Sequence, residues 1–166
     1  LGCSTGALVL LAALLVPELT AVGVELSPSR HAGALEALQR LRKADPGHPG
    51  LARVRFLHAD FRGPGNAELD AILEQATVVY CASEELSHFD AAGSTLSAGT
   101  QLLPVLSRLR PSTRLVTLSL LSPELEDQGF VQLRGAHHLG NAYSVRKDRT
   151  RLALEYEVLG GIETQR

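Results

Sequence analysis

A short glycine-containing turn opens the chain. Gly2-Cys3-Ser4-Thr5-Gly6 leads directly into an apolar run, Ala7 to Val16. Glycine permits a sharp reversal after a strand and lets the backbone approach a bound ligand closely. The turn therefore indicates a nucleotide-type cofactor loop, and the simpler alternative is an ordinary strand-to-helix turn.

Two acidic residues end runs that are typical of β-strands. Glu25 closes the run Thr20 to Leu26, and Asp60, followed by Phe61, closes the run 53–60. A carboxylate offers two strong acceptors, which suits the two hydroxyls of a ribose. A second acid can accept from an adenine amino group while its aromatic neighbour packs on the base. Together with the glycine turn, these acids predict a site for an adenine nucleoside.

The elements needed to position these residues follow from the hydrophobic pattern. Strands are expected at 20–26, 53–60, 77–83 and 114–121, with helices from about 28 to 42, 67 to 74 and 96 to 109. Such alternation requires crossover connections, and it predicts a doubly wound, Rossmann-like α/β fold with a mostly parallel sheet and helices on both faces. After Ser122, period-two runs at 129–133, 142–145 and 151–158 predict an antiparallel strand pair at the sheet edge.

In a doubly wound sheet, ligands bind outside the carboxyl ends of the strands, where the strand order reverses. Counting as the first strand the one in which the chain begins, this rule selects the glycine turn after the first strand, Glu25 after the second (20–26) and Asp60-Phe61 after the third (53–60). It also selects Cys81 to Ser83 after the fourth strand. All four segments are expected at one edge.

Length and composition limit the class of protein. With 166 residues, 45% of them hydrophobic, we expect a single domain over 1–166. The net charge of −2 is too small for the domain as a whole to attract a nucleic acid or a charged membrane surface. The apolar run is well short of the ~20 residues that span a bilayer, and no basic residue precedes it as in a signal peptide. Two cysteines without a CxxC spacing predict a reduced, intracellular protein with no metal site. A start without Met, inside an apparent strand, predicts an N-terminally incomplete domain.

Three motifs resemble those of a known family. "LGCSTG", "VGVELSPSR" and "HADF" are similar to the first three cofactor motifs of class I S-adenosylmethionine-dependent methyltransferases, and the resemblance runs to about Val158. It implies S-adenosyl-L-methionine as cofactor, with Ser4 at the usual central glycine. The cofactor-binding residues that it implies are Gly2, Cys3, Ser4 and Gly6 in the loop, Glu25 at the ribose with Leu26 following it, Asp60 and Phe61 at the adenine, and Cys81 and Ala82 after the fourth strand.

Within that superfamily, "GVELSPSRHAGAL", "ADF" and "ATVVYCAS" resemble the Dot-type (disruptor of telomeric silencing) histone-lysine methyltransferases, although asparagines are usual where "CAS" stands. This resemblance implies a protein lysine on chromatin as methyl acceptor and a nuclear location; otherwise a cytoplasmic one is expected. Methyl transfer from a sulfonium needs mainly orientation and exclusion of water, so no base is assigned. Tyr80 and Tyr143 are the candidates for bordering the substrate, and a buried strand tyrosine is the alternative.

Two other classes of function stay open. Tyr143 and Lys147 form the Y-x-x-x-K pair of NAD(P)-dependent short-chain oxidoreductases, but Phe130 stands where a serine is expected and the glycine spacing differs. A non-catalytic cofactor-binding module is the second alternative. A basic cluster offers a possible nucleic-acid contact, or simply a solvated hairpin tip, and comprises Arg146, Lys147, Arg149 and Arg151. His137 and His138 are not expected to share a metal ion, because adjacent strand residues face opposite ways, and they are interpreted as structural or surface histidines.

Overall fold

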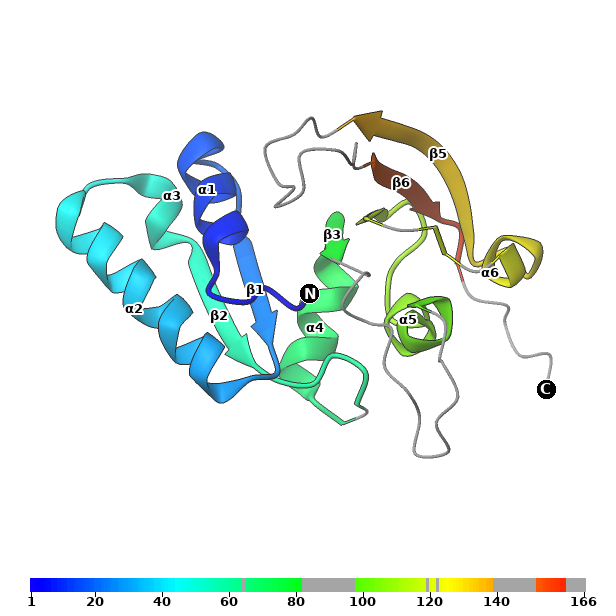
Figure 1. Cartoon of the computed structure of the whole chain (residues 1–166), viewed down its shortest axis with the longest axis horizontal. Helices are drawn as coiled ribbons and strands as arrows, with labels where there is room; N and C mark the ends of the chain where they lie inside the picture. The colour runs from blue at the N-terminus through cyan, green and yellow to red at the C-terminus, as the bar shows by residue number, and fades with distance from the viewer. Residues whose placement is uncertain (64, 82–97, 119, 122, 139–151, 161–166) are drawn as a thin grey trace, which may run out of the picture. The chain divides into compact units, whose positions relative to one another are not determined.

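Helices and strands alternate along the chain, as the sequence predicts (Figure 1). The structure is a computed structural model that describes residues 1–63, 65–81, 98–118, 120–121, 123–138 and 152–160. The chain divides into two compact units, Leu1–Leu69 and Asp70–Arg166, and each is described by itself. The elements are α1 (Ala7–Leu15), β1 (Ala21–Glu25), α2 (Pro28–Ala44), α3 (Pro49–Ala52), β2 (Val54–His58), α4 (Ala67–Gln75), β3 (Val78–Cys81), α5 (Ala98–Leu106), β4 (Arg114–Thr117), α6 (Pro123–Asp127), β5 (Val131–His138) and β6 (Leu152–Val158).

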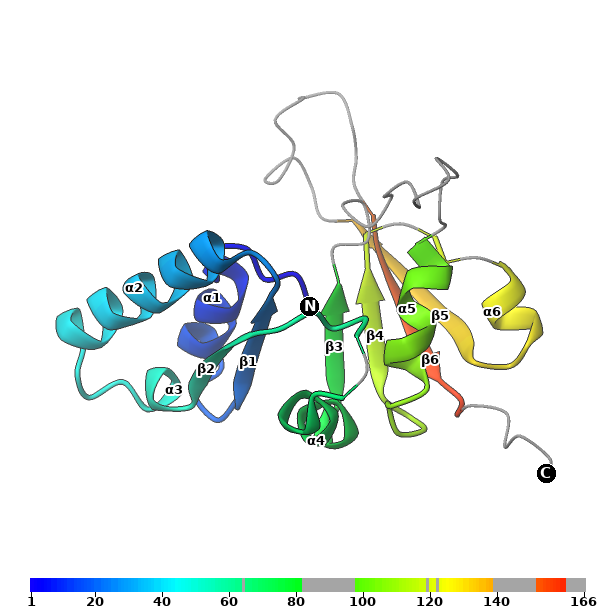
Figure 2. The same cartoon turned by 90° about the horizontal axis from the view of Figure 1, so that it is seen from below.

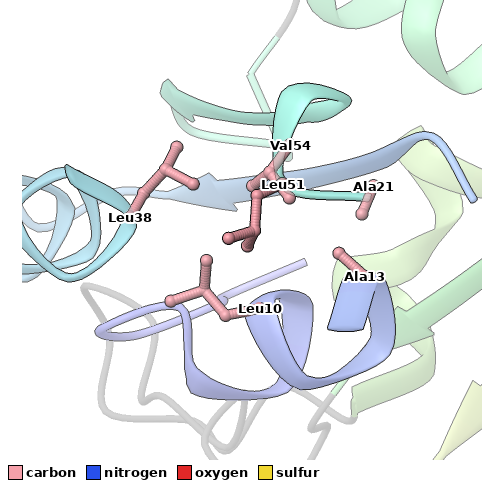
Figure 3. Close-up of a cluster of buried hydrophobic side chains, with 6 residues drawn as sticks. All are labelled: Leu10, Ala13, Ala21, Leu38, Leu51 and Val54. Carbon is pink, nitrogen blue, oxygen red and sulfur yellow. The ribbon is translucent and has the colours of Figure 1, made fainter. Parts of the chain in front are cut away.

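In the first unit, β1 and β2 form a parallel pair, in register from Ala21 opposite Val54 to Glu25 opposite His58. Three helices bury apolar side chains against this pair (Figure 3). The cluster joins all five elements of the unit and comprises Leu10, Ala13, Ala21, Leu38, Leu51 and Val54. One continuous core thus packs against both strands of the parallel pair and fixes the position of their carboxyl ends.

Helix α2 begins where the sequence predicts. The Ser27 hydroxyl caps it by accepting from the Arg30 N–H at 3.5 Å, and Pro28 occupies the first turn. Its buried face carries Ala34 and Leu38. A side-chain cap and a proline at the first helical position are local signals, which is why this boundary is readable without the tertiary structure.

Helix α1 is buried on one face only, although all of its residues are apolar. Leu10 and Ala13 are buried, but Leu8 and Leu11 are each 43% exposed and Leu15 is 72% exposed. Every position of the helix is apolar, so its sequence contains no polar face that would identify the exposed side.

In the second unit, four strands form a sheet in the order β3-β4-β6-β5 (Figure 2). β3 and β4 are parallel, while β6 runs antiparallel to both β4 and β5. The last of the described strands, β6, is therefore inserted between β4 and β5. The expected antiparallel pair at the C-terminal end is confirmed, with Leu154, Tyr156 and Val158 buried and Leu152 38% exposed.

Two short helices are additional to the expected elements. α3 begins within the proline- and glycine-rich segment 45–50, and α6 follows β4. The His48 side chain caps α3 by accepting from the Gly50 N–H at 3.2 Å. The strand expected at 142–145 lies outside the described residues. Among the described helices, none combines the length and the apolar character that a membrane span requires.

Glu155 of β6 forms side-chain contacts with both neighbouring strands, β4 and β5. One carboxylate oxygen accepts from the Arg114 guanidinium of β4 at 2.5 Å, and the other accepts from His137 Nε2 of β5 at 2.9 Å. The hydrogen bond from His137, followed by that from Arg114, holds the pKa of Glu155 below its usual range. His137 thus has an exposed side chain that also contacts Glu155 across the strand pair.

Replacing Glu155 by glutamine is expected to lower the melting temperature at neutral pH. The pKa of Glu155 is lower in the folded state than its value of ~4.3 in the unfolded state. The ionised carboxylate therefore stabilises the fold at any pH above ~4.3. This contribution is lost as the pH falls through the pKa of the folded state. The difference between wild type and variant should therefore shrink below about pH 4. Thermal melts followed by circular dichroism between pH 3 and 7 measure it. The matched control is the exposed Glu74→Gln, and a difference that stays constant with pH would contradict the assignment.

Candidate functional site

Glu25 is the organising residue at the carboxyl edge of the first unit. Its side chain is only 5% exposed. One oxygen, Oε2, accepts from the Ser4 N–H at 2.7 Å, and the other, Oε1, accepts from the Ser27 N–H at 2.9 Å. A single buried carboxylate thus ties the glycine turn to the N-terminus of α2.

The glycine turn has a left-handed backbone at alternate positions. Gly2, Ser4 and Gly6 have φ of 64°, 51° and 80°. The Cys3 N–H donates to the Val24 carbonyl at 3.0 Å, which holds the turn against the end of β1. The sequence prediction that Ser4 occupies a glycine position agrees with its positive φ, a conformation in which a side chain costs roughly 1–2 kcal/mol.

The ring of Phe56, from β2, leaves no room for a side chain at two of the glycine positions. A Cβ added at Gly6 would lie 2.5 Å from Phe56 Cζ, and one at Gly23 would lie 2.5 Å from Phe56 Cδ1 and 2.8 Å from Cys3 Sγ. The ring therefore packs between the turn and β1, in space that a side chain at either glycine would fill. Sequence reasoning placed Phe56 in a strand but gave it no role, because its contacts come from residues far along the chain.

Asp60 follows β2 and lies at the same edge as Glu25. The two strands are parallel, with Glu25 paired to His58, and the Ala59 N–H donates to the Glu25 carbonyl at 3.1 Å. Two strand ends that the sequence predicted to converge are thus adjacent. Phe61 is 6% exposed, so its ring is buried.

The Asp60 carboxylate is bound by Arg62. Oδ1 accepts from the Arg62 backbone N–H and from Nε, both at 2.9 Å, and Oδ2 accepts from Nη2 at 3.0 Å. The side-chain hydrogen bonds from Arg62 lower the pKa of Asp60, and Asp60 in turn raises that of Arg62. Sequence reasoning missed Arg62; its only signal was a basic residue two positions after the acid.

Leu26 presents an apolar side chain beside Glu25. It is 50% exposed, and its carbonyl accepts from His58 Nε2 at 2.8 Å. The His58 ring lies 5.5 Å from that of His31, on the first turn of α2. These contacts fix the backbone of Leu26 while its side chain stays accessible to a ligand.

The remaining predicted residues belong to the second unit. Cys81 ends β3 and is 1% exposed, and Tyr80 beside it is half-buried. Burial raises the pKa of the Cys81 thiol. Burial is also the largest cause of the raised pKa of the half-buried Cys3 thiol. Ala82 and Tyr143 lie outside the described residues, as does the basic cluster at 146–151.

No protein-family model and no curated protein matches the sequence, but solved structures match the fold. The antibiotic-resistance methyltransferase Kmr has 15% identity and a TM-score of 0.64, over 97% of this chain and 85% of that one. The glycopeptide N-methyltransferase MtfA, complexed with S-adenosyl-L-methionine, has 15% identity and a TM-score of 0.63, over 96% and 80%. Magnesium protoporphyrin IX methyltransferase (ChlM) from Synechocystis PCC 6803, with bound SAH, has 14% identity and a TM-score of 0.58, over 95% and 71%.

These likenesses establish the fold. The chain shares the Rossmann-like α/β fold of these structures, with parallel strands, intervening helices and an antiparallel C-terminal pair, so the fold class expected from the sequence is confirmed.

Proposed function

We propose that this chain is an S-adenosylmethionine-dependent methyltransferase that binds the adenosyl group at the carboxyl edge of β1 and β2. The proposal combines the fold shared with known methyltransferases and the three sequence motifs at that edge. The cofactor-binding residues in the first unit are those that the sequence predicted: Gly2, Cys3, Ser4, Gly6, Glu25, Leu26, Asp60 and Phe61.

The main support for the proposal is the hydrogen bonding of the Glu25 carboxylate. A carboxylate has about four lone-pair positions, and the Ser4 and Ser27 N–H groups use one on each oxygen. Each oxygen keeps one position, which matches the two hydroxyls of a ribose. Because Glu25 is buried, hydrogen bonds to its charge are stronger than the same bonds in water.

The glycine turn also fits an adenosyl ligand. A Cβ at Gly2 would meet no atom of the described first unit within 4 Å, so within this unit the turn is open on that side. Leu26 offers an exposed apolar side chain one residue after the acid, suited to the face of a base. The turn, the acid and the apolar side chain thus supply what the polar and apolar parts of the ligand require.

When bound, adenosylmethionine supplies a methyl group on a positively charged sulfonium. The residues of this chain have the tasks of orienting the ligand and excluding water, and these need no dedicated base. In this proposal Glu25 binds the ribose, and the glycine turn binds the methionine part of the ligand. For Tyr80 and Tyr143 at the methyl acceptor, and for Cys81 and Ala82 at the cofactor, the proposal rests on the sequence motifs alone.

The methyl acceptor is the finer part of the proposal. The resemblance to Dot-type enzymes favours a protein lysine on chromatin and a nuclear location, and it rests on the sequence alone. None of the three solved structures named above is a histone methyltransferase. Transfer of labelled methyl groups to reconstituted nucleosomes is the expected result. Unlabelled nucleosomes in a preparation that binds the cofactor would contradict this acceptor.

Calorimetric titration of the purified chain with S-adenosylhomocysteine and with NAD tests the class of function. We expect saturable binding of the adenosyl ligand and none of NAD. Binding of NAD alone would favour the oxidoreductase alternative based on Tyr143 and Lys147. Binding of the adenosyl ligand without transfer to any acceptor would favour a cofactor-binding module.

A further inference from the structure

We propose that Arg62 is a positioning residue that selects an adenine over a 6-oxopurine base by leaving Asp60 a single free acceptor position. This inference rests on the proposed function, because it concerns how the adenosyl ligand is recognised at the same edge. Arg62 itself need not touch the ligand.

The geometry of the pair limits what Asp60 can accept. Both lone-pair positions of Oδ1 are used by Arg62, one by its backbone N–H and one by Nε, and one position of Oδ2 is used by Nη2. One position remains, on Oδ2. The amino group of adenine can donate to it, whereas the carbonyl of a 6-oxopurine would meet the carboxylate as a second acceptor.

The pair also has the stiffness and accessibility that such a role requires. Two side-chain bonds and one backbone bond fix the carboxylate, and a guanidinium fork is the group best suited to hold a carboxylate in one orientation. The Asp60 side chain is 38% exposed and that of Arg62 is 33% exposed. The remaining acceptor is thus oriented in advance but still accessible.

The ratio of affinities for S-adenosylhomocysteine and S-inosylhomocysteine measures this selection. The full chain should prefer the adenosyl ligand by about tenfold or more, the effect of one hydrogen bond to a charged group. Arg62→Ala should reduce the preference to within about threefold, because the carboxylate can then rotate and be solvated. Arg62→Lys, which keeps the charge but loses the fork, should give an intermediate ratio.

Two further readouts separate positioning from a structural role. Asp60→Asn should invert the preference toward the inosyl ligand, since an amide NH2 in the place of Oδ2 donates to a carbonyl, although this NH2 loses the bond from Arg62 Nη2. In wild type, adenosyl binding should persist to a lower pH than in Arg62→Ala, because Arg62 holds the pKa of Asp60 down. The matched control is Arg40→Ala, which removes an exposed arginine paired with Glu36 and should change neither ratio nor pH profile.

The outcomes distinguish this inference from the proposed function. If wild type binds neither nucleoside, the proposed function fails. If wild type binds the adenosyl ligand and Arg62→Ala retains the full preference, the role of Arg62 is wrong while the function stands. Tighter adenosyl binding by Arg62→Ala would also overturn the role, because it would mean that Arg62 competes with the base.

Discussion

Replacing Glu25 by glutamine is expected to weaken binding of S-adenosylhomocysteine by about 10- to 150-fold, equivalent to about 1.5–3 kcal/mol for the loss of charge-assisted hydrogen bonds. In the wild type both carboxylate oxygens accept protein N–H groups. An amide keeps one acceptor, and its NH2 group then faces either the Ser4 or the Ser27 N–H. The variant should therefore lose both ribose affinity and part of the tie between the turn and α2.

Calorimetry on folded protein measures the affinity, and urea unfolding followed by circular dichroism measures the stability of the same preparation. Glu18→Gln is the matched control, because Glu18 is an exposed acid in the segment before β1. It should leave both quantities unchanged. A folded Glu25→Gln protein with wild-type affinity would remove Glu25 from the binding site.

Gly6→Ala is expected to lower the free energy of unfolding by about 2–5 kcal/mol, of which ~1–2 kcal/mol comes from the left-handed backbone and ~1–3 kcal/mol from overpacking. Gly6 has a φ of 80°, and an added Cβ would lie 2.5 Å from Phe56 Cζ and 3.1 Å from the Ala34 Cβ. The same edge of the ring also lies against Gly23 of β1, where an added Cβ would be 2.6 Å from Phe56 Cε1. The methyl group must therefore displace the turn or the ring.

Gly47→Ala is the control for this substitution, because a Cβ there meets nothing within 4 Å and its φ is not positive. Urea unfolding should show almost no change for it. Adding Phe56→Leu to Gly6→Ala should recover part of the steric loss but none of the backbone loss. Equal stability of the Gly6 and Gly47 variants would show that the turn is not packed on Phe56.

The sequence by itself determined the alternation of elements and the boundaries that depend on neighbouring residues. Ser27-Pro28 defines the start of α2, and period-two burial at Leu154, Tyr156 and Val158 identifies β6, because caps and periodicities are local. The same reasoning placed Glu25 and Asp60 at one edge, since parallel neighbouring strands end together.

Only the tertiary structure decided what those residues contact. The insertion of β6 between β4 and β5 depends on pairings between distant segments, and the buried face of α1 depends on which apolar side chains meet β1 and α3. The partners of Glu25 and the packing of Phe56 under the glycine turn also join residues from separate elements. Periodicity and motif spacing describe neighbours along the chain, whereas these contacts arise from the three-dimensional packing, which brings the ends of separate strands and turns together.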